Sequence, residues 1–133
     1  MRCPCRKKSE TVTYDACCGP LHARVRAAPS AEALMRSRYA AFVRDDVDYL
    51  LETWAPQTRP PHVTFIVGQA WLILRVLTTH TDGDRATVEF LARSRIHGRI
   101  EDLHEISRFE RVEGRWYYVD GVIKRAAPAT NAR

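Results

Sequence analysis

Residues 30–54 carry apolar side chains at the spacing of two amphipathic helices. Ser30 can cap the first helix, because its hydroxyl can accept a hydrogen bond from a backbone N–H of the first turn. The apolar positions of this helix are Ala31, Leu34, Met35, Tyr39, Phe42 and Val43. Asp45 or Asp46 can cap a second, short helix in the same way. Its apolar positions are Val47, Leu50, Leu51 and Trp54, and the prolines at 56, 60 and 61 predict a loop after it.

From Trp71 onward the apolar pattern changes to the alternation that is typical of β-strands. The predicted strands are residues 71–79, 85–95, 99–111 and 115–123. They are separated by Asp82-Gly83, His97-Gly98 and Glu113-Gly114, which are hairpin signals. Strands joined in this way make an antiparallel meander. Two helices followed by a four-stranded meander predict an α+β fold, in which a curved sheet wraps around the N-terminal helices.

The hairpins also predict which strand positions lie opposite one another, because a two-residue turn fixes the register of its strands. In this register Glu105 lies opposite Phe90 and Val122, and Ser107 lies opposite Val88 and Asp120. One face of the sheet then carries Val88, Phe90, Ala92, Leu103, Phe109, Trp116 and Tyr118, and is expected to be the inner face. The outer face is expected to carry Glu89, Arg93, His104, Arg108 and Tyr117.

Three polar residues, Glu105, Ser107 and Asp120, share the apolar face in this register. A carboxylate there must be paired, protonated or open to a cavity, because burial of an isolated charge is very unfavourable. In one interpretation Glu105 and Asp120 bond to Arg36, Arg38 or the backbone and fasten the helix to the sheet. In the other, Glu105, Ser107, Asp120 and Arg38 line a ligand pocket, with Glu105 as the candidate base.

Composition narrows the class of protein. The chain has 133 residues, 45% of them hydrophobic, which is enough for one core in one domain. The net charge is +5, but the basic residues are scattered, and this disfavours dedicated nucleic-acid binding. No apolar run follows the charged start of the chain, as one would in a signal peptide. The longest apolar stretch, residues 70–77, is interrupted by Arg75 and is too short to cross a membrane, so we expect a cytoplasmic protein.

The four cysteines, Cys3, Cys5, Cys17 and Cys18, all lie near the start of the chain. In the reducing cytosol cysteines serve metals more often than disulfides. Two thiolate pairs that close a short loop supply the four-sulfur shell that zinc prefers, and zinc would fold a segment too short and polar to fold alone. Zinc is therefore the expected cofactor. A disordered tail and a redox pair stay open as alternatives, as does replacement of one adjacent cysteine by His22.

This segment resembles the SEC-C zinc motif, named for the carboxyl end of the SecA translocation ATPase. The residues that carry the resemblance are Cys3-Pro4-Cys5, Tyr14 and Cys17-Cys18-Gly19-Pro20. Arg6-Lys7-Lys8 replaces the Gly-Ser-Gly turn of the motif, and the spacer before Cys17 is longer than usual. In SecA the similar motif contacts SecB and the ribosome. The resemblance therefore implies a protein or ribosome partner, which the basic residues of this loop would suit.

The remainder of the chain resembles the bacterial YchJ family. The blocks that carry the resemblance include ALMRSRYAAF at 33–42, HEISRF at 104–109 and GRWYYVDG at 114–121. The resemblance implies a cone-shaped fold of the nuclear-transport-factor-like or cystatin-like kind. It implies no reaction, because the family has none assigned. Members usually read Thr-Trp-His-Pro where this chain has Thr53-Trp54-Ala55-Pro56, so a histidine that could serve as a base is missing here.

We therefore divide the chain into a SEC-C-like zinc segment at 1–23, an α+β cone domain at 29–124 and a disordered tail at 125–133. The first functional hypothesis is a zinc-binding accessory or adaptor protein that contacts its partners through the zinc segment. The second is a small-molecule-binding or catalytic cone domain that uses Glu105, Ser107 and Asp120. No sequence motif indicates a particular reaction. A homodimer through the exposed sheet face also stays open.

Overall fold

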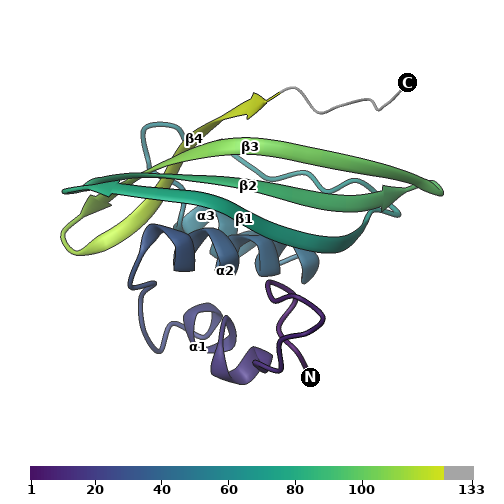
Figure 1. The fold of residues 1–133 in the computed structure, drawn as a ribbon. Helices are drawn as coiled ribbons and strands as arrows, with labels where there is room; N and C mark the ends of the chain where they lie inside the picture. The colour runs from purple at the N-terminus through teal and green to yellow at the C-terminus, as the bar shows by residue number, and fades with distance from the viewer. Residues whose placement is uncertain (125–133) are drawn as a thin grey trace.

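The computed structural model describes residues 1–124, which form three stacked layers (Figure 1). One layer is a curved four-stranded sheet. Helices α2 (Ala31–Val43) and α3 (Val47–Glu52) cover one face of this sheet. The N-terminal segment lies on the far side of α2 and contains the 3-10 helix η1 (Tyr14–Ala16) and the short helix α1 (Gly19–His22). The predicted α+β fold is confirmed, and the tail predicted at residues 125–133 lies outside the described residues.

The two main helices begin where the sequence predicts them. Ser30 Oγ accepts a hydrogen bond from the Ala33 N–H at 3.0 Å, and Asp46 Oδ1 accepts one from the Tyr49 N–H at 3.1 Å. These bonds satisfy N–H groups of the first turn that have no partner within the helix. Asp45 adopts a positive φ of 56°, the left-handed conformation that ends many helices, and redirects the chain from α2 into α3. Of the two candidate caps for the second helix, Asp46 is the one used.

The sheet is the predicted antiparallel meander, with its strands in the order β1-β2-β3-β4. The strands are β1 (Ala70–Asp82), β2 (Arg85–Ile96), β3 (Arg99–Val112) and β4 (Arg115–Lys124). Both residues of the His97-Gly98 and Glu113-Gly114 turns have positive φ, as two-residue hairpins of the primed type require. The pairing of β1 with β2 shifts register at two places. Such irregularities bend a strand and help to curl a sheet around the helices beneath it.

The pairing of β2 with β3 confirms the register predicted from the hairpin between them. Glu105 pairs with Phe90, and Ser107 pairs with Val88. The large apolar residues assigned to the inner face are buried or partly buried. The outer face carries side-chain pairs instead, among them His104 with Glu89. The inner and outer faces of this part of the sheet are therefore as predicted.

The register predicted for the far end of β4 is wrong, because a β-bulge interrupts its pairing with β3. Tyr118 pairs with Phe109, but Asp120 pairs with Arg108, so Val119 has no partner position of its own. One extra residue reverses the alternation of side chains beyond it. Asp120 consequently lies on the outer face, where Arg108 Nε and Nη2 donate to its two carboxylate oxygens at 2.6 and 2.5 Å.

One hydrophobic core joins the three layers. Buried members of this core come from the N-terminal segment, the helices and the sheet, for example Cys5, Leu21, Leu34, Leu50, Val88 and Trp116. Helix α2 lies at the centre of the stack, between the N-terminal segment and the sheet. Within residues 1–124, no helix is long and apolar enough to span a membrane.

Candidate four-cysteine centre and ligand cavity

The four predicted cysteine ligands converge in the N-terminal segment. A short antiparallel pairing holds Cys3, whose N–H donates to the Val12 carbonyl at 2.9 Å. Cys17 and Cys18 lie between η1 and α1. The four Sγ atoms all lie within 4.8 Å of one another. The Sγ–Sγ distances are 3.6 Å for Cys5–Cys17, 3.9 Å for Cys17–Cys18 and 3.7 Å for Cys5–Cys18.

These separations fit a metal centre and not a disulfide, in which the two sulfur atoms lie about 2.05 Å apart. Four sulfurs at about 2.3 Å from a tetrahedral zinc ion lie about 3.8 Å from one another. Hydrogen bonding with Cys3 and Cys5, together with burial, raises the pKa of the Cys18 thiol. Burial and these neighbours therefore disfavour the Cys18 thiolate, whereas a bound cation favours it. The donor set can hold a metal ion.

Two hydrogen bonds fasten the N-terminal segment to α2. Arg36 Nη1 donates to the Cys5 carbonyl at 2.7 Å. His22 is buried, and its Nε2 donates to the Ser37 carbonyl at 2.8 Å, which leaves Nδ1 to accept from the Tyr14 hydroxyl at 2.7 Å. Both ring nitrogens of His22 are thus engaged, and this histidine is not one of the clustered ligands. Arg36 faces the cysteine segment, so the interpretation that it pairs with Glu105 is wrong.

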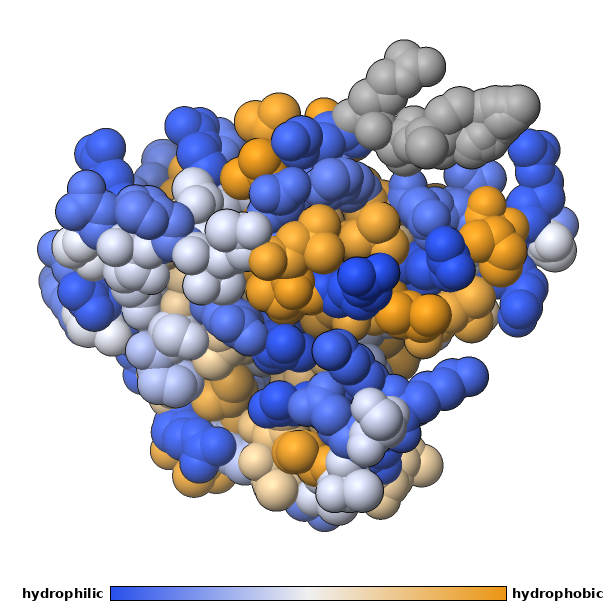
Figure 2. Space-filling view, viewed as in Figure 1, coloured by the Kyte–Doolittle hydropathy of each residue, from blue (hydrophilic) through white to orange (hydrophobic). Residues whose placement is uncertain are grey.

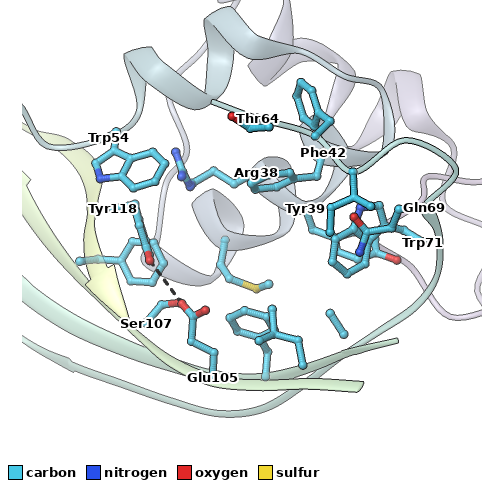
Figure 3. Close-up of a pocket in the computed structure, with 17 residues that line it drawn as sticks. Arg38, Tyr39, Phe42, Trp54, Thr64, Gln69, Trp71, Glu105, Ser107 and Tyr118 are labelled. Atoms are coloured by element: carbon cyan, nitrogen blue, oxygen red, sulfur yellow. Dashed lines mark hydrogen bonds between the residues drawn. The ribbon is translucent and has the colours of Figure 1, made fainter. Parts of the chain in front are cut away.

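A cavity of about 350 Å³ lies between α2 and the inner face of the sheet (Figure 3). Its walls are mainly apolar and aromatic, with Phe42 from α2, Trp71 from β1 and Leu103 from β3. Among the described residues that line it, Arg38 is the only cation and Glu105 the only carboxylate. This volume is at the lower end of the range of about 300–1,000 Å³ that is usual for small-molecule sites.

Arg38 is the most unusual group of the cavity, because it is a buried cation without a counter-ion. Its residue is only 6% exposed, and no carboxylate of residues 1–124 forms an ion pair with it. Nη1 donates to the Leu50 carbonyl and to Thr53 Oγ1, both at 2.7 Å. The guanidinium carbon lies 5.0 Å from the ring centroid of Trp54 and 4.6 Å from that of Tyr118. Burial lowers the pKa of Arg38 to about 10, so its side chain is still charged at neutral pH.

The two aromatic rings beside Arg38 are positioned by the backbone. The segment after α3 pairs with β4: Tyr118 N–H donates to the Thr53 carbonyl at 2.8 Å, and Ala55 N–H donates to the Tyr118 carbonyl at 2.7 Å. This pairing brings the Trp54 and Tyr118 rings together edge to face, with centroids 5.0 Å apart. Ala55, at the position of the missing histidine, is fully buried in this junction.

Glu105 extends from β3 into the cavity, as the register predicts (Figure 3). Its Oε2 accepts a hydrogen bond from Ser107 Oγ at 2.6 Å and a longer one from the Tyr118 hydroxyl at 3.4 Å. Burial, reinforced by the charge of Glu105, raises the pKa of Tyr118, so this hydroxyl keeps its proton. The interpretation in which Glu105 bonds directly to Arg38 is therefore wrong, because Ser107 and Tyr118 are its partners.

The β4 bulge places Gly121 opposite Ser107, where Asp120 had been expected. A Cβ atom at Gly121 would overlap the carboxylate of Glu105, so the missing side chain leaves the space that Glu105 occupies. The sequence contained one sign of this role, because glycine inside a strand often marks a close approach. The apolar pattern places Trp54 on a helix stripe and Tyr118 on the inner face of the sheet, and nothing in it distinguishes a core aromatic from one that lines a cavity.

We expect Gly121→Ala to lower the free energy of unfolding by about 1–3 kcal/mol, the usual effect of overpacking. The added methyl group must displace Glu105 from Ser107 and Tyr118. The double variant Gly121→Ala/Glu105→Ala should therefore lose much less than the sum of the two single losses in urea unfolding. Val122→Ala, at an exposed neighbour on the same strand, is the control and should change little. Strictly additive losses would contradict the steric relation.

Comparison with known proteins bears on the family and the fold. Residues 30–121 match the family described as YchJ, middle NTF2-like domain. A UPF0225 protein of Bordetella pertussis is 50% identical over 126 residues, which cover 92% of each chain. One of Streptomyces coelicolor is 47% identical over 119 residues and covers 90% of this chain and 93% of its own.

Two solved structures have the same fold. A SEC-C motif containing protein from Rhodopseudomonas palustris, solved in solution, aligns with a TM-score of 0.80 and 44% identity over 88% of this chain and 96% of its own. A crystal structure of a sec-c motif containing protein from Psychrobacter arcticus aligns with a TM-score of 0.74 and 25% identity, over 93% of this chain and 83% of its own.

The fold and the two sites define a class of protein: an NTF2-like α+β domain that carries a four-cysteine segment on its central helix. Within this class the chain belongs to the YchJ family. The resemblance noted from the cysteine and helix motifs is thereby confirmed.

Proposed function

We propose that this protein binds a small, largely apolar molecule in the cavity between α2 and the sheet. The observation that carries the proposal is a cavity of about 350 Å³ whose wall contains the buried Arg38, which forms no ion pair with any other residue of 1–124. A cation without a counter-ion destabilises a protein interior. A structural role explains the hydrogen bonds of Arg38 Nη1, which join α2 to the end of α3. A structural role does not explain the open volume beside the guanidinium.

A neutral fluorescent probe, N-phenyl-1-naphthylamine, tests whether the cavity takes up apolar molecules. We expect its emission to rise and saturate at one probe per chain. Leu103→Trp fills the cavity from β3 and should weaken probe binding at least about tenfold, because an indole occupies the apolar volume. Leu91→Trp, the same change on the opposite face of the neighbouring strand, should bind like the unmodified protein. Equal binding by both variants would contradict a ligand site in this cavity.

We further propose that the metal of the four-cysteine centre is zinc and that it stabilises the N-terminal segment against α2. Three of the four cysteines are buried, and all four are close enough for tetrahedral coordination. Such closed four-sulfur shells are typical of structural zinc sites. Retention of four free thiols requires a reducing compartment, which supports a cytoplasmic location.

A second candidate function is that of an adaptor that contacts the ribosome or a protein through the N-terminal segment. Arg2, Lys7 and Lys8 are exposed there, and Figure 2 shows hydrophilic side chains projecting from this part of the molecule. A basic surface of this kind attracts ribosomal RNA or an acidic protein. If the ribosome is the partner, Lys7→Glu/Lys8→Glu should lose co-sedimentation with purified ribosomes. Arg85→Glu/Arg95→Glu, which reverses two exposed charges on the sheet, should retain it. Equal sedimentation of both variants would contradict this function.

A further inference from the structure

We propose that the ligand of the cavity is a small organic acid, whose carboxylate binds Arg38 and whose adjacent hydroxyl or amino group donates to Glu105. This inference rests on the proposed function, because it specifies what the cavity holds. The inference rests on the hydrogen-bonding groups of Arg38 and Glu105 that have no partner among residues 1–124, and on the side chains around them.

The Arg38 guanidinium is held in place, and some of its N–H donors have no partner among residues 1–124. Nη1 is the guanidinium nitrogen with hydrogen-bond partners among residues 1–124, and Nε and Nη2 have none there. The guanidinium lies close to the rings of both Trp54 and Tyr118, at one end of the cavity (Figure 3). A planar guanidinium pairs best with a planar carboxylate, and such a bond is strong where water is excluded. A carboxylate would also supply the ion-pair partner that Arg38 lacks among residues 1–124.

Glu105 narrows the choice of anion. It is the only other charged residue in the described lining, so the cavity offers one positive and one negative charge. A phosphate with two charges would meet a single arginine, and Glu105 would repel it more strongly than it repels a singly charged acid. A simple cation would be repelled by Arg38. An acid with a single charge fits, provided that a donor group of its own faces Glu105.

Glu105 has an oxygen available for such a donor. Ser107 and Tyr118 both bond to Oε2, and Oε1 has no partner among residues 1–124. Tyr118 links the two charged ends, because its ring lies beside Arg38 and its hydroxyl reaches Glu105. A hydroxyl or amino group close to the ligand carboxylate is therefore expected to lie near this tyrosine.

The rest of the cavity selects an apolar body. Phe42, Phe65 and Trp71 form an aromatic cluster away from Arg38, with Phe42 at 6.0 Å from Phe65 and 6.4 Å from Trp71 between ring centroids. Met35 and Leu103 add aliphatic and thioether surface. Aromatic walls of this kind favour a phenyl ring packed edge to face. A phenyl group on a short carboxylic acid combines an apolar ring for these walls with a carboxylate for Arg38.

Three probes of nearly equal size test the assignment on the unmodified protein by titration calorimetry. They are 3-phenylpropionate, its neutral amide 3-phenylpropionamide and the hydroxylated acid 3-phenyllactate. We expect the amide to bind at least about tenfold more weakly than 3-phenylpropionate, because it has no negative charge and only one acceptor oxygen to offer Arg38. One enantiomer of 3-phenyllactate should bind several-fold more tightly than 3-phenylpropionate, and Glu105→Gln should reduce that advantage.

Two variants test whether Arg38 recognises the carboxylate. Arg38→Met should bring the acid and the amide to similar affinity, whereas Arg111→Met should preserve their difference. Arg111 is the matched control, because its guanidinium carbon also lies 5.0 Å from a tryptophan centroid, that of Trp116, but outside the cavity. If Arg38→Met does not fold, as judged by circular dichroism, the comparison of acid and amide on the unmodified protein still decides.

The outcomes separate the two proposals. Equal affinity for the acid and the amide overturns recognition by Arg38. Failure of all three probes, with binding of N-phenyl-1-naphthylamine that Leu103→Trp abolishes, overturns the organic acid and leaves the proposed function standing. If neither N-phenyl-1-naphthylamine nor any of the three phenyl compounds binds, both the proposed function and the organic-acid proposal are overturned.

Discussion

Replacement of Cys5 by serine should abolish binding of the proposed zinc ion and destabilise the protein by several kcal/mol. Cys5 is 0% exposed, and its Sγ lies 3.6 and 3.7 Å from those of Cys17 and Cys18. Isolated zinc-binding peptides derive on the order of 10 kcal/mol from their metal. Here the cone retains its own contacts, so we expect a smaller loss of about 3–5 kcal/mol, or a fall in Tm of more than about 10 °C.

Two measurements check this result. Mass spectrometry of protein purified without added metal should find about one zinc per unmodified chain and almost none in Cys5→Ser. Thermal unfolding followed by circular dichroism gives the change in Tm. Ala16→Ser is the control, because it places the same hydroxyl on an exposed residue next to Cys17 and should change stability by less than about 0.5 kcal/mol. An unchanged Tm in Cys5→Ser, or a fully loaded variant, would rule out a structural metal bound by this residue.

Truncation of Leu34 to alanine should have the largest effect of any single core change on α2, a loss of about 3–5 kcal/mol. Leu34 is 2% exposed and borders a groove together with Leu21, Tyr49 and Trp116. It therefore touches the region where the N-terminal segment, α3 and β4 meet. A cavity at this junction cannot close by movement of one neighbour alone, and such sites lose the most on truncation.

Urea unfolding measures the effect, with Val43→Ala as the control. Val43 is on the same helix but 37% exposed, so its truncation should lower the free energy of unfolding by less than about 1 kcal/mol. A loss for Leu34→Ala as small as that of the control would mean that the three layers do not share one core.

The helices, the strands and most of the register were predictable, because each depends on local signals. Ser30 and Asp46 cap the helices through their own side chains. The turn at His97-Gly98 alone fixes the pairing of Glu105 with Phe90. The clustering of four cysteines at the start of the chain likewise predicted a site without knowledge of the fold.

The far end of β4 was not predictable from such signals. The bulge at Val119 coincides with long-range bonds, in which Tyr118 pairs with residues 53–55 and Thr58 Oγ1 donates to the Val119 carbonyl at 2.6 Å. Contacts between segments so distant in sequence do not appear in the periodic pattern of apolar residues. The predicted register placed Asp120 on the inner face, whereas the structure places it on the outer face and sets Gly121 opposite Ser107. The sequence predicts Arg38 as a pocket residue, but the folded structure is needed to find that it forms no ion pair within residues 1–124.

Helix α2 presents consecutive residues to two different sites. Arg36 and Ser37 hold the cysteine segment, and Arg38 and Tyr39 line the cavity. Under the two proposals, a metal ion and a cavity ligand would each hold this helix in place, and binding at one site would then be linked to binding at the other. If the metal raises the affinity for a cavity ligand by some factor, that ligand must raise the affinity for the metal by the same factor. Under both proposals, protein without zinc would release a cavity ligand more readily, and protein with a bound ligand would lose zinc more slowly.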